Sequence, residues 1–184
     1  MKIVHKIDKL RPSIPNAAEG VFPPSVDTYK QDKQSNVFIS PYHGSDELKE
    51  NLRIARFMSR KLKSPVYLLP RLDPDNKTEN LLRNSLLPKG IPNRKNVDMM
   101  SQGKLIEAKS MLSATTAGKK QIKRAIQKRI QEAFNQADDC IIELPDRFIR
   151  KDIHAAIKGY LKGAQHTHSI VIKWRGKCLI YSNE

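Results

Sequence analysis

A short segment of alternating sequence, GKLIEAKS at residues 103–110, combines apolar side chains with one acid, Glu107, and a base two residues later, Lys109. In a β-strand successive side chains point to opposite faces of the sheet, so Glu107 and Lys109 share one face. A carboxylate beside an ammonium group has two common uses in proteins. It is either an ordinary surface ion pair or part of a site where charge develops during a reaction. The residues that precede the segment bear on this choice.

These preceding residues predict a hairpin with a two-residue turn. Glycine at the second turn position supplies the positive φ that tight hairpin turns require, so a turn at 102–103 pairs Ser101 with Lys104. Counting outward from this pair puts Asp98 opposite Glu107, while the other face of the hairpin receives apolar side chains. A shift of the register by one residue would move Asp98 to the wrong face.

Two carboxylates at opposed positions favour a cation between them, because like charges directly opposite one another destabilise a sheet. Mg²⁺ is commonly held by one or two carboxylates together with water and phosphate oxygens. Asp98 and Glu107 are therefore candidate ligands for Mg²⁺ or another divalent metal, and Lys109 is a candidate for orienting an attacking water molecule. This combination predicts metal-assisted cleavage of phosphodiesters. The alternative is the charged outer face of an ordinary strand.

The charge of the chain restricts the classes of partner. Of its 184 residues 34 are Lys or Arg and 19 are Asp or Glu, which gives a formal net charge of +15. Such a surface attracts polyanions, so nucleic acid is the first candidate partner and an anionic membrane surface the second. No apolar segment reaches the roughly 20 residues that a membrane span needs. The sequence also lacks the Cys/His spacing of a zinc site and the glycine pattern of a nucleotide site.

A long basic helix is predicted over residues 119–137, because apolar residues recur along it at helical spacing. The basic residues that gather on this helix are Lys119, Lys120, Lys123, Arg124, Lys128 and Arg129. We interpret them as a surface that binds the phosphates of nucleic acid, with a solvated helix face as the alternative. Gln136, at the end of the helix, is a further candidate for the catalytic site.

The elements around these residues predict an α/β domain at residues 45–184, preceded by a proline-rich arm or linker at residues 1–44. The predicted order is helix, three strands, helix, strand, helix and a C-terminal hairpin that turns at 175–176. Residues 71–95 are interpreted as a long polar loop with one helical turn, the kind of loop that often carries function. The fold class is therefore a mixed central sheet flanked by helices.

With these residues in place, the chain resembles the PD-(D/E)xK nuclease superfamily, which has a restriction-endonuclease-like core of helix, three strands, helix and strand. The superfamily carries an Asp in the second strand and (D/E)xK in the third, which correspond here to Asp98 and to Glu107 with Lys109. The proline that leads the family motif is replaced by Val97. The resemblance implies a metal-dependent endonuclease in which Asp98 and Glu107 hold the metal.

The same resemblance often includes an acid on the first helix, for which Glu50 is preferred here over Glu47. More narrowly, residues 96–182 are similar to the C-terminal nuclease domains of contact-dependent growth inhibition and other polymorphic toxins, and to modules appended to phage head proteins. In these a helix ends in a Gln-Ala-Asp stretch, here at 136–138. This similarity implies RNA, including tRNA, as substrate, an immunity protein as partner, and action in the cytoplasm after delivery as the C-terminal part of a larger secreted or phage protein.

Three other interpretations stay open. The toxin families also include barnase/EndoU/colicin/RelE-like ribonucleases, which use no metal and form a 2′,3′-cyclic phosphate through acid–base side chains. The candidate residues for that chemistry, with Glu107 or Lys109 as partners, are His166, His168, Arg175 and Ser182. The second interpretation is a nucleic-acid-binding module without catalysis. The third is an interaction protein whose basic surface meets an acidic partner.

Overall fold

The computed structural model describes residues 3–4, 29–87, 91, 95–115, 118–163 and 169–182. The chain divides into two compact units, an N-terminal unit of residues 8–106 and a C-terminal unit of residues 107–184 together with residues 1–7. Each unit combines a mixed sheet with helices, so the predicted α/β class is confirmed. Within the described part of the chain, no helix has the length and apolar character to cross a membrane.

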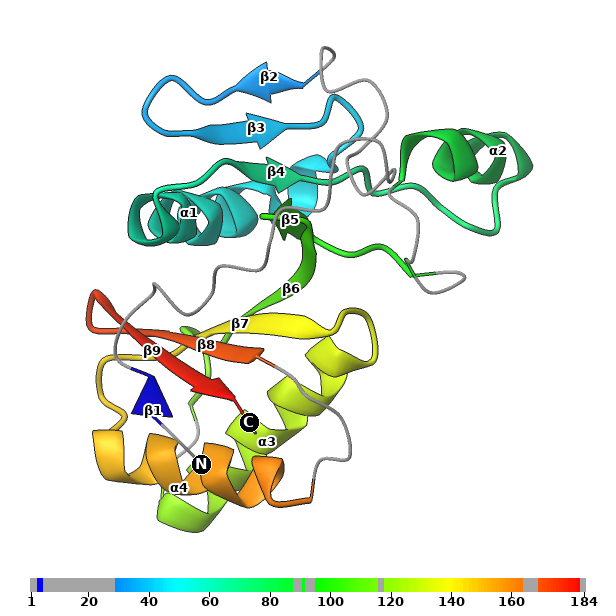
Figure 1. Cartoon of the computed structure of the whole chain (residues 1–184). Coiled ribbons are helices and arrows are strands. Elements are labelled where there is room, and N and C mark those ends of the chain that lie inside the picture. Colours follow the sequence, from blue (N-terminus) through cyan, green and yellow to red (C-terminus); the bar gives the residue numbers. More distant parts are fainter. Residues whose placement is uncertain are drawn as a thin grey trace. The chain divides into compact units, whose positions relative to one another are not determined.

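The sheet of the N-terminal unit has both parallel and antiparallel neighbours. Its strands in spatial order are β2 (Lys30–Gln31), β3 (Val37–Ile39), β4 (Val66–Leu68), β5 (Met99–Ser101) and the first part of β6 (Lys104–Ser110). Strands β3 and β4 are parallel, and the other pairs are antiparallel. Helix α1 (Ser45–Leu62) connects this parallel pair and packs on it, and helix α2 (Lys77–Leu86) follows β4 along the chain (Figure 1).

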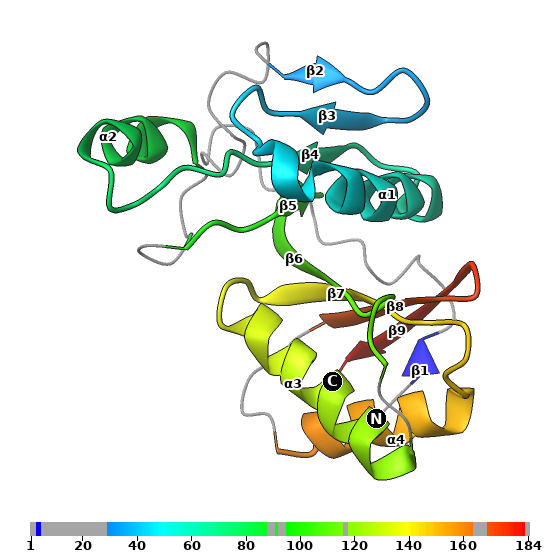
Figure 2. The same ribbon diagram turned by 180° about the vertical axis from the view of Figure 1, so that it is seen from behind.

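The C-terminal unit continues from β6 in the order β7 (Asp139–Glu143), β8 (Ser169–Trp174), β9 (Lys177–Ser182) and β1 (Ile3–Val4). Strands β7 and β8 are parallel and are connected through helix α4 (Arg150–Leu161), while β9 is antiparallel to both of its neighbours. Helices α3 (Lys119–Phe134) and α4 cover one face of these strands, as both views show (Figures 1 and 2).

The core of the C-terminal unit lies between this sheet and the two helices. Alternate residues of the parallel strands point to the helices, which is the spacing that a strand face requires. The residues that meet there include Cys140, Ile142, Ile170 and Ile172 from the strands and Ile126, Ile130, Ile153 and Ile157 from the helices, all fully buried. This packing fixes α3 against β7 and β8, and β7 is the neighbour of β6 in the sheet.

The hairpin register predicted from the sequence is confirmed. Ser101 pairs with Lys104, and the intervening turn at 102–103 has positive φ angles of 51° and 73°. One step outward, Met99 pairs with Ile106. A glycine at the second turn position adopts this left-handed conformation without strain, so the turn type and the register follow from the same residue.

Two short strands of the N-terminal unit lie before α1, one of them at the segment NVFISP (residues 36–41), whose sequence is compatible with a strand. Residues 30–39, which the sequence analysis assigned to an arm at 1–44, form β2 and β3 of the N-terminal unit. Asp32 connects this segment to α1. The Arg56 guanidinium, on that helix, donates hydrogen bonds to both carboxylate oxygens of Asp32, at 2.6 and 3.0 Å. These hydrogen bonds lower the pKa of Asp32 to about 2. The division between units falls within β6 instead of at residue 44.

The segment at 71–95 also differs from the prediction, because it contains α2. The Asn76 side chain caps this helix by accepting hydrogen bonds from the backbone N–H groups of Thr78 and Glu79, at 3.0 and 3.3 Å. Asparagine is among the most favourable residues at this position. The cap lies in a stretch of polar residues without a clear apolar stripe, which is why the sequence predicts only one helical turn where the structure has ten helical residues.

Candidate catalytic site

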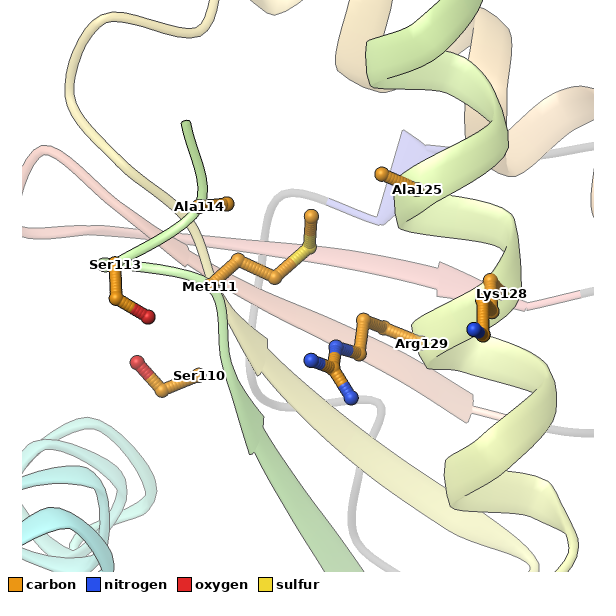
Figure 3. A pocket seen from close by; sticks show the side chains of 7 residues that line it. All are labelled: Ser110, Met111, Ser113, Ala114, Ala125, Lys128 and Arg129. Atoms are coloured by element: carbon orange, nitrogen blue, oxygen red, sulfur yellow. The ribbon is translucent and has the colours of Figure 1, made fainter. Parts of the chain in front are cut away.

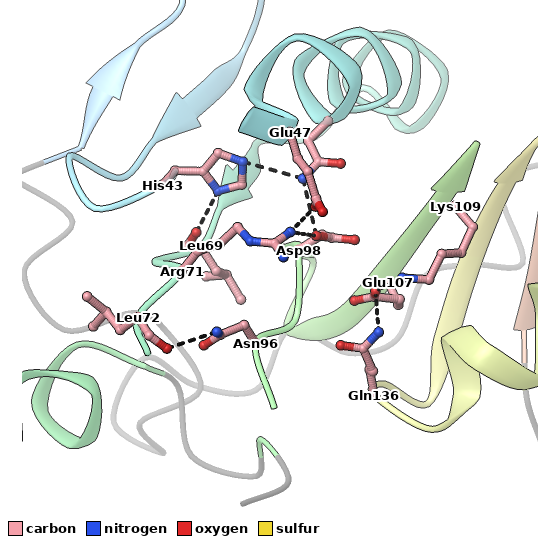
Figure 4. Close-up of polar contacts among 11 residues, drawn as sticks. His43, Glu47, Leu69, Arg71, Leu72, Asn96, Asp98, Glu107, Lys109 and Gln136 are labelled. Atoms are coloured by element: carbon pink, nitrogen blue, oxygen red, sulfur yellow. Dashed lines mark hydrogen bonds and ion pairs between the residues drawn. The ribbon is translucent and has the colours of Figure 1, made fainter. Parts of the chain in front are cut away.

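Three of the predicted site residues meet in the C-terminal unit. Strand β6 carries Glu107, which is 2% exposed, and Lys109. The Lys109 ammonium forms an ion pair with Oε1 of Glu107. The Gln136 side chain donates from Nε2 to the same oxygen at 2.7 Å (Figure 4). A cation and an amide therefore converge on one buried carboxylate.

The local sequence explains how these side chains are brought together. Lys109 follows Glu107 by two residues on a strand, so both point to the same face, and Ala108 between them is buried on the other. Helix α3 ends at Phe134, and the backbone N–H of Gln136 donates to the carbonyl of Ala133 at 2.9 Å. The chain therefore continues the last turn for two residues and presents Gln136 to Glu107.

This cluster combines a buried carboxylate with two hydrogen-bond donors, an arrangement that suits a site where charge develops during a reaction. A carboxylate removed from water is costly unless other groups bind it, and here both donors serve that purpose. The Lys109 side chain remains 23% exposed, so its ammonium group reaches solvent while it contacts Glu107. Within this ion pair the Lys109 side chain is therefore partly exposed to solvent, whereas the Glu107 side chain is buried.

A second cluster surrounds Asp98 in the N-terminal unit, directly before β5. Asp98 is 2% exposed, and its Oδ1 accepts hydrogen bonds from Asn51 Nδ2 at 3.2 Å and from Arg71 Nη1 at 3.1 Å. Arg71 also forms an ion pair with Glu47, so one guanidinium contacts two carboxylates (Figure 4). Arg71 and Asn51 together compensate the charge of the buried aspartate.

The cluster extends to His43, which the sequence analysis missed because it lies in the segment assigned to the arm. The Nδ1–H of His43 donates to the carbonyl of Leu69 at 2.7 Å (Figure 4). This leaves Nε2 as an acceptor for Asn51 Nδ2 at 3.4 Å. Because Asn51 also donates to Asp98, His43 positions the amide that holds the aspartate. Nothing in the local sequence around His43 indicated this contact.

We expect His43 to make folding stability depend on pH. Burial lowers its pKa below the ordinary value of 6.5; Arg71 acts in the same direction, while the Leu69 carbonyl, Asp98 and Glu47 act against it. The unfolded chain therefore binds a proton below pH 6.5 that the folded chain does not yet bind, and stability is lost as the pH falls from 6.5 to the folded pKa. The free energy of unfolding should be measured by chemical denaturation across this pH range for wild type and His43→Gln. Only wild type should show the additional loss of stability as the pH falls. The same dependence of the unfolding free energy on pH in both proteins would contradict this prediction.

The acidic residue on the first helix differs from the predicted preference. Glu50 is exposed on α1, and among the described residues no hydrogen bond or ion pair joins it to Asp98. Glu47 instead reaches the Asp98 cluster through Arg71. The difference follows from the direction of α1, which turns the side of Asn51 and Ile54 toward the core. Glu47, four residues before Asn51, lies on nearly the same side of the helix.

All six predicted nucleic-acid-binding residues lie exposed on α3. Two of them are partly compensated, because Glu132 contacts Arg129 at 2.7 Å and Lys128 at 3.9 Å. Of the residues proposed for metal-free cleavage, Arg175 is exposed and donates to the Asp146 carbonyl at 2.8 Å, and Ser182 ends β9. His166 and His168 lie outside the described residues.

The donor atoms of the two clusters suit a hard divalent cation. Among the described residues no group of three or more His, Cys, Asp or Glu side chains is placed to hold a metal ion. Mg²⁺ does not require such a group, because it keeps several water ligands and uses one or two carboxylates together with substrate phosphate. Asp98 in the N-terminal unit and Glu107 in the C-terminal unit are each a buried carboxylate.

The remaining source of functional information is similarity to other proteins. Comparison of this chain with protein-family models, with curated proteins and with solved structures gives no match.

Proposed function

We propose that this protein is a metal-dependent nuclease that hydrolyses phosphodiester bonds, with RNA as the favoured substrate. The observation that carries the proposal is the buried Glu107, bound on one oxygen by both Lys109 and Gln136. Buried ionisable groups with specific charged partners are concentrated at functional sites. The E-x-K pair lies on the second strand of a hairpin that has the expected register, which supports the resemblance to PD-(D/E)xK nucleases.

In this proposal Asp98 and Glu107 hold the divalent metal. The support is local to the hairpin, in which Met99, the chain neighbour of Asp98, pairs with Ile106, the chain neighbour of Glu107. The bound metal would stabilise negative charge on the phosphate and make its water ligand more acidic. Arg71 offsets the charge of Asp98, and Gln136 fixes the orientation of the Glu107 carboxylate.

The ammonium group of Lys109 orients the attacking water. The water oxygen forms a bond to phosphorus, the bond from phosphorus to the leaving sugar oxygen breaks, and a proton from the water finishes on that leaving oxygen through solvent. Lys109 suits this role because it touches Glu107 and remains in contact with solvent. A group placed in advance near developing charge lowers the barrier without reorganising during the step.

The substrate class is inferred from charge. The net charge of +15 and the exposed basic residues of α3 favour a polyanion, and the phosphate backbone supplies most of the affinity in such complexes. The resemblance to polymorphic toxins favours RNA, including tRNA, over DNA. It also favours an acidic immunity protein as a partner, a site of action in the cytoplasm, and delivery as part of a larger secreted or phage protein.

The substrate class can be tested by incubating the purified protein with total RNA, with tRNA and with plasmid DNA in Mg²⁺. Cleavage of RNA with intact plasmid is the expected result. Cleavage of plasmid alone would support the nuclease but contradict the choice of RNA. No cleavage of any substrate, together with RNA binding, would contradict catalysis and leave the second candidate, a nucleic-acid-binding module based on the exposed cations of α3.

A further inference from the structure

A pocket lies in the C-terminal unit, between the end of β6 and helix α3. Its lining residues are Ser110, Met111, Ser113, Ala114, Ala125, Lys128 and Arg129. Its volume is about 180 Å³, compared with about 10–15 Å³ that one water molecule needs on the same measure. The pocket can therefore accept a group much larger than water.

The lining has the chemistry of an anion site. Figure 3 shows the Arg129 guanidinium extending from α3 toward the end of β6, where the hydroxyl groups of Ser110 and Ser113 point toward one another. A guanidinium is always charged and offers several N–H donors in one plane, which matches phosphate oxygens. Lys128, on the adjacent helix position, adds a second cation to the lining.

The carboxylates near this pocket are already engaged. Glu132 pairs with Arg129 and, at longer distance, with Lys128, while Glu143 pairs with Lys173. The Ser110 hydroxyl also donates to Glu143 at 3.3 Å. Hydroxyl groups can rotate toward a ligand, and an exposed Arg–Glu pair is weak enough to rearrange. The lining can therefore present Arg129, Lys128 and two hydroxyl groups to one phosphate.

We propose that this pocket binds a phosphate group of the RNA backbone next to the phosphate that is cleaved. Ser110 follows Glu107 by three residues on β6, which corresponds to roughly 10 Å along a strand. This separation along the backbone is short enough for one strand of RNA to span. The position of the neighbouring phosphate rests on the proposed function, whereas the binding of a phosphate group does not.

The test compares two variants that remove one charge from the same helix. Arg129→Gln changes a residue of the pocket, and Arg124→Gln changes an exposed residue of α3 outside its lining. Binding of a labelled 12-nucleotide single-stranded RNA is measured by fluorescence anisotropy in EDTA, where metal-dependent cleavage cannot occur. Arg129→Gln should weaken binding at least about tenfold, as expected for the loss of charge-assisted hydrogen bonds. Arg124→Gln should weaken it no more than about threefold, because it removes one exposed cation of the α3 surface that lies outside the pocket.

A second arm uses inorganic phosphate as the probe and follows backbone amide signals by NMR. Phosphate should shift the signals of Ser113 and Ala125 in wild type and in Arg124→Gln, but not in Arg129→Gln. Equal losses of RNA affinity in the two variants would overturn the proposal, even if free phosphate alone occupied the pocket. Selective loss in Arg129→Gln without any RNA cleavage by wild type would refute the proposed function and leave the pocket as a phosphate site.

Discussion

Glu107→Gln is expected to lower the rate of RNA cleavage by at least about 100-fold, the loss typical when one group that acts on transition-state charge is removed. The two side chains have nearly the same size, and the amide oxygen can still accept the hydrogen bond from Gln136. The change therefore removes the negative charge and leaves the packing almost unaltered. Cleavage rates should be compared in Mg²⁺ and RNA affinities in EDTA, where the variant should bind within about twofold of wild type, because the basic residues of α3 are unchanged.

The same substitution has a second consequence that separates catalysis from folding. Without the carboxylate, Lys109 keeps its charge but loses its partner, and the free energy of unfolding should fall by about 1–3 kcal/mol. The lower part of this range is expected, because the Lys109 side chain is 23% exposed and water can solvate it. Circular dichroism should show a folded protein at assay temperature. A folded variant that cleaves RNA at the wild-type rate would contradict the role of Glu107.

Asp98→Asn is expected to raise the Mg²⁺ concentration for half-maximal cleavage by about 10–100-fold or more, the range observed when the surroundings of a metal ion are disturbed. An amide oxygen is neutral and binds a hard cation more weakly than a carboxylate does. The amide can still accept from Asn51, so the cluster should keep its structure. The measurement is the cleavage rate as a function of Mg²⁺ concentration.

Asp32→Asn is the matched control for this variant. Asp32 is also a well-paired aspartate of the N-terminal unit, but it binds Arg56 and has no place in the proposed site. The control should therefore lower stability without changing the Mg²⁺ requirement. If both variants shifted the Mg²⁺ dependence equally, or if neither did, Asp98 would not be a metal ligand.

The parts of the site that could be predicted from the sequence depend on local geometry. A glycine in a two-residue turn sets the hairpin register, and alternation along a strand then places Glu107 and Lys109 on one face. Gln136 could be anticipated because it follows a helix of clear apolar period, although the resemblance to toxin nucleases, and not the period, drew attention to it. The order of the main helices and strands followed from the same short-range patterns.

The parts that could not be predicted depend on contacts between distant segments. Asn51 and Asp98 are separated by 47 positions, and the apolar spacing of α1 does not reveal that an asparagine occupies its buried face. The apolar spacing of the sequence favours a stripe along Leu48, Leu52, Ala55 and Leu62. The buried apolar residues of α1 are instead Ile54, Ala55, Phe57 and Met58. This rotation of the helix explains why Glu47 and not Glu50 joins the Asp98 cluster.

The N-terminal segment was underestimated for a related reason. Its prolines and polar residues resemble a linker, and only the pairing of β3 with β4 and the Asp32–Arg56 contact reveal that residues 30–39 belong to a folded unit. His43 was overlooked together with this segment. Short strands carry little periodic information, so their assignment depends on partners that are far away in the sequence.

The most direct test of the proposed chemistry is RNA cleavage by the wild-type protein in Mg²⁺ and in EDTA, with the ends of the products identified. Metal-assisted hydrolysis predicts cleavage only in Mg²⁺, with one product end carrying a phosphate monoester and the other a hydroxyl group. Glu107→Gln, purified in the same way, controls for contaminating ribonucleases. Cleavage that persists in EDTA and leaves 2′,3′-cyclic phosphate ends would contradict the metal site and favour the metal-free mechanism.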